Sequence, residues 1–225
     1  MELGIITADI VGSGKLAPPM REQLYAELKA CMQSLKKEKW VAKFEMFRGD
    51  SLQCVAVHKE QSLRVALMVR AFMKSYTGEK ELDKSKANAT KGYFQGSQDI
   101  RLSIGIGKVD FYNQKSLAQS DGEAFRLSGE GLDSLKNATY RMAFKASDRT
   151  FTEWMEPTVM LLDAVIQKWT NNQAEAVLYR LKELKEEEIS KMLGVSQSAV
   201  NQRLKTGQWF AIEKLLHYFE QKLKS

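Results

Sequence analysis

Histidine, cysteine and proline are scarce in this chain of 225 residues. The two histidines, His58 and His217, are too few for a histidine-based metal site or catalytic triad, so we expect neither. The two cysteines, Cys31 and Cys54, lie within apolar patterns and have no metal-ligand spacing. We therefore expect reduced core cysteines, as in a cytosolic protein.

Long apolar runs are also missing. No stretch approaches the roughly 18 consecutive apolar residues that a bilayer-spanning helix requires, and no basic segment precedes the first apolar residues. We therefore expect a cytoplasmic protein with no membrane partner. The hydrophobic share of 44% and the charged share of 28% are those of an ordinary globular protein, and the net charge of +6 mildly favours a polyanionic partner.

Apolar periodicity and turn residues give the order β-α-β-β-α-β, followed by α-β and then by helices alone. The predicted strands cover 3–11, 41–47, 52–57, 100–109 and 140–146, and the predicted helices follow Pro18-Pro19 and cover 60–73 and 120–136. The polar stretch 75–98 has no period and is predicted to be a mobile loop. The expected fold is α+β: a ferredoxin-like sheet with its helices on one face, followed by an all-α domain. We place the boundary near Glu156-Pro157, which gives domains 1–156 and 157–225.

Residues 184–204 have the pattern of two short helices around a tight turn. Gly194 can adopt the positive φ that ends the first helix, and Ser196 is suited to cap the second. Ile189, Met192 and Leu193 form the expected apolar face of the first helix, and Val200 and Leu204 point inward from the second. This layout predicts a helix-turn-helix with its recognition helix at about 197–206. The segment resembles the helix-turn-helix of response-regulator and sigma-factor proteins.

The polar residues of the second helix point outward, and we expect them to contact DNA. Asn and Gln can bond adenine, and Arg or Lys can bond guanine or phosphate. The predicted DNA-binding residues are Ser196, Gln197, Ser198, Asn201, Gln202, Arg203 and Lys205. From Ile189 onward, lysine and arginine outnumber glutamate by six to two, so the basic surplus lies in this region. The alternative is that these helices bind another protein.

A second candidate site lies near the start of the chain. Asp9 ends a buried strand, and Asp50 lies in a hairpin turn, so neighbouring strands would bring the two carboxylates together. Two carboxylates with few neighbouring cations suit Mg²⁺. The turn of Gly12, Ser13 and Gly14, with Lys15, can bind phosphate through its N–H groups and its positive charge. The alternative is that both aspartates serve only as turn residues.

The motifs Asp9-Ile10-Val11-Gly12-Ser13 and Gly49-Asp50 resemble those of class III nucleotidyl cyclase palm domains. The strand beginning at Arg101 and the helix start at Asp121-Gly122 are also similar to that fold. More narrowly, the chain resembles the SatD-like family, whose members open with a similar motif and often end in a helix-turn-helix. The resemblance implies metal binding by Asp9, Asp50 and the Ile10 carbonyl, with Mg²⁺ and a nucleoside triphosphate as ligands.

The resemblance also implies an asparagine and an arginine on a later helix, where this chain has Arg126 and Glu130. An acidic residue in place of a phosphate-stabilising cation opposes phosphoryl transfer. We therefore expect little or no catalysis, and a bacterial DNA-binding transcription regulator with a degenerate cyclase-like sensor or assembly domain. The alternative is a Mg²⁺-dependent nucleotidyl cyclase, or another phosphoryl-transfer enzyme, with an appended helix-turn-helix. Because helix-turn-helix proteins bind as two-fold dimers, we expect a homodimer formed through the N-terminal domain on double-stranded DNA.

Overall fold

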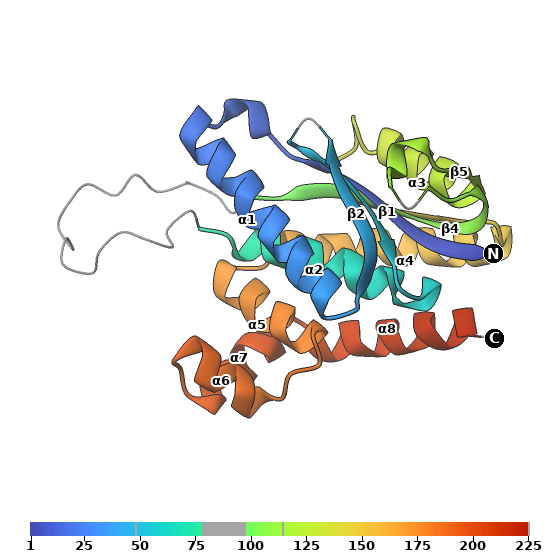
Figure 1. Ribbon diagram of the computed structural model, residues 1–225. Helices are drawn as coiled ribbons and strands as arrows, with labels where there is room; N and C mark the ends of the chain where they lie inside the picture. The colour runs from blue at the N-terminus through green and yellow to red at the C-terminus, as the bar shows by residue number, and fades with distance from the viewer. Residues whose placement is uncertain (48, 78–97, 114, 225) are drawn as a thin grey trace.

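The structure is a computed structural model, and it describes residues 1–47, 49–77, 98–113 and 115–224 (Figure 1). Nearly all of the loop predicted at 75–98 lies outside these residues. In the part of the chain that is described, no helix is both long enough and apolar enough to cross a membrane.

One sheet organises the N-terminal part of the chain. Its strands are β1 (Glu2–Ile10), β2 (Val41–Phe47), β3 (Ser51–Ala56), β4 (Ile100–Phe111), β5 (Asp121–Gly122) and β6 (Met142–Ala146). The order is β2-β3-β1-β4-β5, and β6 pairs with β4 in parallel while all other pairs are antiparallel. The order β2-β3-β1-β4 is what a β-α-β-β-α-β chain produces when each helix returns the chain across the sheet. The α+β class is therefore confirmed.

Helices cover both faces of the sheet. Helices α1 (Pro18–Lys37) and α2 (Ser62–Ser75) pack on the face to which Ile6 and Ile10 of β1 point. Helix α3 (Glu123–Ser134) packs on the opposite face, where Ile5 and Phe125 belong to a second apolar cluster. This alternation along β1 follows from the two-residue period of a strand. The expectation of helices on one face holds for α1 and α2 but is wrong for α3.

The helical C-terminal part of the chain begins at Arg149, before the predicted domain boundary near Glu156-Pro157. Helix α4 (Arg149–Gln167) runs without a break across the predicted boundary and contains Pro157. The helices that follow are α5 (Asn171–Leu181), α6 (Glu186–Leu193), α7 (Gln197–Thr206) and α8 (Trp209–Lys224). Phe144 of β6 packs on Phe151 of α4 and Phe219 of α8, with ring centroids 5.2 and 5.7 Å away. The sheet and the C-terminal helices therefore share one hydrophobic core.

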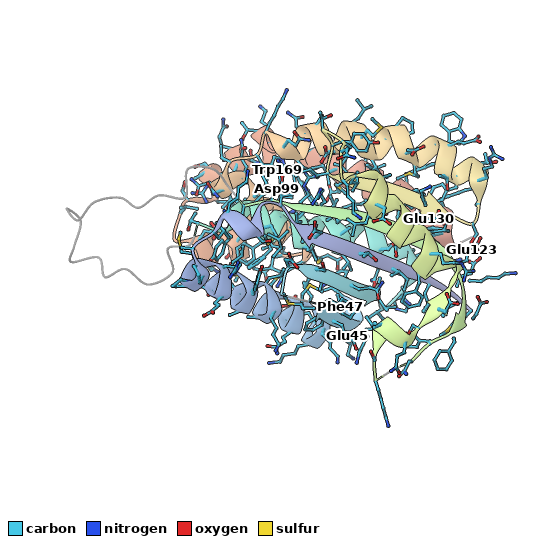
Figure 2. All side chains as sticks on the ribbon, turned by 90° about the horizontal axis from the view of Figure 1, so that it is seen from above. Glu45, Phe47, Asp99, Glu123, Glu130 and Trp169 are labelled. Atoms are coloured by element: carbon cyan, nitrogen blue, oxygen red, sulfur yellow. The ribbon has the colours of Figure 1, made fainter. Side chains whose placement is uncertain are left out.

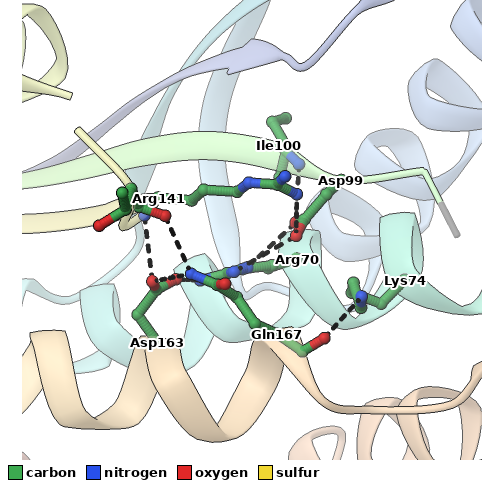
Figure 3. A network of polar contacts seen from close by, with 8 residues as sticks. Arg70, Lys74, Asp99, Ile100, Arg141, Asp163 and Gln167 are labelled. Carbon is green, nitrogen blue, oxygen red and sulfur yellow. Dashed lines mark hydrogen bonds and ion pairs between the residues drawn. The ribbon is translucent and has the colours of Figure 1, made fainter. Parts of the chain in front are cut away.

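A buried ionic network connects these two parts (Figure 3). Arg70 of α2 is fully buried and pairs with Asp99, at 3.1 Å from Nε to Oδ1, and with Asp163 of α4. Arg141 pairs with the same Asp99 through Nη1 at 2.6 Å. Two arginines and two aspartates balance in charge, which is the condition under which buried ions are tolerated. Lys74 of α2 lies close by, and its burial lowers its pKa.

Candidate nucleic-acid interface and carboxylate site

Helices α6 and α7 form the predicted helix-turn-helix geometry. Gly194 has φ 64° and ψ 32° and ends α6 in the left-handed conformation, which glycine adopts without strain. The Ser196 side chain caps α7 by accepting from the Ala199 N–H at 3.2 Å. Ile189, Val200 and Leu204 are buried as expected, but Met192 is exposed, so the apolar face of α6 is narrower than its sequence indicates.

The C-terminal end of α7 is held by polar contacts as well. The Trp169 indole donates from Nε1 to the Gly207 carbonyl at 2.9 Å, and the Gln173 amide donates to Thr206 Oγ1 at the same distance. Both acceptors lie at the C-terminal end of α7, and both donors lie at or near the junction of α4 and α5. Helix α7 is thus fixed in orientation, and α6 and α7 lie at one end of the molecule, below α5 (Figure 1).

The predicted DNA-binding side chains lie on the outer side of this helix. All are exposed except Arg203, which is partly buried. In the described part of the chain, Arg203 and Lys205 have no ion-pair partner. Ser196 and Ser198 bond each other through their hydroxyls at 2.9 Å. The geometry therefore leaves the two cations and the Gln197 and Gln202 amides available to a ligand.

Asn201 differs from these residues, because its side chain is already in contact with α6. Its amide donates to the Glu186 carboxylate, with Nδ2–Oε distances of 3.3 and 3.4 Å. This contact ties the two helices together and places a negative charge beside the recognition helix. A ligand that bonds the Asn201 amide has to compete with Glu186.

At the other site, Asp9 has an arginine partner. The antiparallel register places Asp9 of β1 opposite Ser51 of β3 and opposite Arg101 of β4. Arg101 Nη2 lies 2.6 Å from Asp9 Oδ2, and both side chains are partly buried. The expectation of few neighbouring cations is therefore wrong, because the cross-strand position supplies one.

Asp50 lies beside the glycine turn. The Ile10 N–H donates to the Asp50 carbonyl at 3.0 Å, and the Ser13 hydroxyl donates to its carboxylate at 3.2 Å. The Lys15 N–H donates to the Gly12 carbonyl at 2.9 Å, so this N–H cannot join a phosphate-binding nest. Of the four predicted phosphate-binding residues, Lys15 can therefore contribute only through its exposed side chain.

Gly49, which precedes Asp50, fixes the shape of the hairpin. Its φ of 86° is left-handed, and a Cβ at this position would lie 2.5 Å from Cε2 of Tyr25. Only glycine fits, since any side chain would meet both the backbone strain and the ring. The hairpin is thereby held against α1 with Asp50 next to Ser13.

The donor set fits a divalent cation poorly. In the described residues, no group of three or more His, Cys, Asp or Glu side chains could hold a metal ion. Asp9 is already neutralised by Arg101, which leaves the Asp50 carboxylate and backbone carbonyls as oxygen donors. Mg²⁺ would then need water and substrate phosphates for most of its six positions.

The two positions of α3 that the cyclase resemblance singles out form exposed ion pairs. Arg126 Nη1 lies 3.0 Å from Asp121 Oδ1, and its Nη2 lies 3.8 Å from Asp110. Glu130 pairs with Lys145 at 3.9 Å, and Figure 2 shows it on the outer surface of α3. Neither ion pair leaves a free cation that could stabilise a phosphate group.

One family model matches part of the chain. Residues 160–207 match the family model described as sigma-70, region 4, a stretch from α4 through α7. No curated protein matches the chain. Among solved structures, a bacterial light-regulated adenylyl cyclase is 18% identical, with a TM-score of 0.40 over 64% of this chain and 74% of its own. The adenylyl cyclase CyaB from P. aeruginosa is 15% identical, with a TM-score of 0.42 over 67% and 78%. These two likenesses are distant.

The contacts that occupy the candidate residues join segments that are distant in the sequence. The partner of Asn201 is 15 residues away and that of Asp9 is 92 residues away. The second could have been found by aligning the strands, since an antiparallel register with Ile10 opposite Ile100 places Asp9 opposite Arg101.

Proposed function

We propose that this protein is a DNA-binding transcription regulator that contacts the major groove of double-stranded DNA with α7. The observation that carries the proposal is the agreement between the α6–turn–α7 geometry and the match of residues 160–207 to sigma-70 region 4. The outer side of α7 is polar, is exposed, and has two cations without ion-pair partners in the described residues.

In this proposal the residues of α7 have different roles. Lys205 and Arg203 neutralise phosphates, a sequence-independent contribution that weakens as salt rises. Gln197 and Gln202 read base edges, because an amide can bond adenine in two places. Asn201 reads a base only after leaving Glu186, so its contribution to affinity is smaller than that of a free asparagine.

The experiment is selection from random duplexes, followed by titration of the enriched site at several salt concentrations. Lys205→Ala should weaken binding to all sequences alike and flatten the salt slope by about one unit. Gln202→Ala should cost about 1–3 kcal/mol at the enriched site and relax its specificity. Lys29→Ala on the exposed side of α1 is the matched control and should leave both quantities unchanged. If selection enriches nothing and Lys205→Ala changes nothing, the helices bind a different partner.

For the N-terminal sheet we propose a degenerate, cyclase-like sensor or assembly unit rather than an enzyme. The support is electrostatic: Arg101 neutralises Asp9, and Arg126 and Glu130 are in exposed ion pairs. A magnesium-bound nucleoside triphosphate is the ligand class to test, because Lys15 and the glycine turn lie beside Asp50. Arg101 has to leave Asp9 before that carboxylate can hold a cation.

Incubation with Mn²⁺ and each nucleoside triphosphate separates this reading from the enzyme alternative. We expect no cyclic nucleotide and no diphosphate release, because Glu130 stands where the cyclase resemblance implies a phosphate-stabilising cation. Turnover that Asp50→Ala abolishes would establish the alternative, a phosphoryl-transfer enzyme with an appended helix-turn-helix.

A further inference from the structure

Helices α4 and α8 share an apolar surface that faces away from the core. Trp154 and Leu161 of α4 are 70% and 72% exposed, and Tyr218 of α8 is 54% exposed. Trp154 and Leu161 lie seven residues apart, so they follow one stripe of the helix. Single exposed apolar side chains are common on a protein surface, whereas a contiguous apolar patch marks an interaction site.

A groove of about 280 Å³ lies between the two helices. Its lining includes Thr158, Leu161, Val165, Ala211, Ile212 and Leu215, and no lining residue is charged. Depletion of charge together with exposed aromatic side chains is the composition of an interface core. The surface therefore has both parts of a self-complementary contact: a ridge at Trp154 and Leu161, and a groove beside it.

The size of this face matches a second copy of the chain. At 1.5 Å per residue, α4 and α8 are about 28 and about 24 Å long, and two packed helices present a width of roughly 20 Å. The projected area is on the order of 500 Å², the same order as the roughly 800 Å² that a standard interface buries on each partner. A single docked helix would cover only about half of that width.

We propose that two copies of this chain associate through α4 and α8, with the ridge of each copy in the groove of the other. A two-fold axis satisfies this arrangement, because the same patch then serves both partners. The four helices form a bundle in which Leu161, Thr158 and Leu215 lose contact with water. This interface differs from the dimer through the N-terminal domain that we expect from the sequence.

The same arrangement bears on DNA, and this part of the inference rests on the proposed function. The groove is lined at one end by Gln208, two residues after the last residue of α7. A dimer through α4 and α8 therefore holds its two recognition helices near the axis. Two-fold helix-turn-helix proteins contact half-sites about 34 Å apart on DNA. We therefore expect the DNA site of this dimer to be an inverted repeat.

Sedimentation equilibrium of the full chain without DNA tests the interface. The wild type should have twice the 25.6 kDa chain mass at micromolar concentration, and Leu161→Glu should have the single-chain mass. Phe111→Glu at the end of β4 is the matched control: it also replaces an exposed apolar side chain, and it should stay dimeric. Because Leu161 is exposed, its replacement should leave the thermal unfolding midpoint of the monomer unchanged, and circular dichroism checks that it folds.

Tryptophan fluorescence provides a second measurement. Trp154 is the one exposed tryptophan, since Trp169 and Trp209 are buried and Trp40 is partly buried. Acrylamide should therefore quench Leu161→Glu more strongly than the wild type, and Trp154→Phe should remove the difference. A wild type that stays monomeric at 100-fold higher concentration, or a dimer that Leu161→Glu leaves intact, would overturn the proposal. A dimer that binds no DNA would refute the proposed function and leave this interface standing.

Discussion

Replacing Asp163 by asparagine should destabilise the protein more than any comparable surface change. The Asp163 carboxylate accepts from Arg70, from the Gln167 amide at 2.6 Å and from the Arg141 N–H at 3.1 Å. Asparagine keeps the size but removes the charge. The buried Arg70 and the partly buried Arg141 then share the single carboxylate of Asp99, and one positive charge is left without compensation.

The magnitude follows from burial. Arg70 and Asp163 are almost completely inaccessible, so water cannot solvate the charge that the substitution exposes. Removing one partner of such a pair costs about 3–5 kcal/mol, a large part of the roughly 5–15 kcal/mol that stabilises a domain. Lys74 adds to the effect, because its ammonium group lies nearby and its pKa is already lowered by burial.

Urea unfolding at pH 7, followed by far-ultraviolet circular dichroism, measures this loss. Glu153→Gln is the control: it removes a carboxylate from the exposed Arg149–Glu153 pair and should cost less than about 0.5 kcal/mol. Arg70→Met combined with Asp163→Leu keeps the charges balanced, so it should recover part of the stability lost in Asp163→Asn. A loss below about 1 kcal/mol for Asp163→Asn would show that water solvates the network, which contradicts the burial of Arg70 and Asp163.

Three further predictions concern other parts of the chain. Gly194→Ala should lower the free energy of unfolding by about 1–2 kcal/mol, because φ is 64° there, and Gly194→Asn should cost less; equal losses in urea would contradict this. Arg101→Ala should tighten Mn²⁺ binding, measured by water proton relaxation, since it frees the Asp9 carboxylate, whereas Arg101→Lys should not; no change would remove Asp9 as a ligand. Burial raises the pKa of the Cys54 thiol to about 12, so below that pH a thiol reagent should modify Cys31 first in the native protein, and rapid reaction of both would refute the burial.

Local patterns explain what the sequence could predict. The strands are visible because alternate residues of β1 face opposite sides of the sheet, and the helix-turn-helix is visible because Gly194 and Ser196 lie a fixed distance apart in one short segment. Each of these signals depends on neighbours within a few residues. The strand order then follows from connectivity alone.

The contacts between distant segments could not be predicted in the same way. Arg70 lies in an apolar helix and reads as a surface residue, yet its partners are 29 and 93 residues away. The start of α4 was missed because Pro157 reads as the first turn of a helix. The N-terminal cap of α4 is Asp148, which accepts from the Phe151 N–H at 3.0 Å, and this local signal was available in the sequence.

A sensor role for the sheet requires a physical path from the sheet to α7, and the shared core provides one. Phe144 of β6 contacts Phe219 of α8, and Arg64 of α2 pairs with Glu220 of the same helix at 2.7 Å. Because α8 follows α7 after a two-residue link and also forms one wall of the α4–α8 groove, a shift of α8 would move the recognition helix and the proposed dimer interface together. A ligand at Asp50 can change the affinity for DNA only if it binds the protein more tightly when α8 is in one of two positions than when it is in the other. Coupling would therefore appear as a change in dimer dissociation constant on addition of nucleotide, without any contact between nucleotide and DNA.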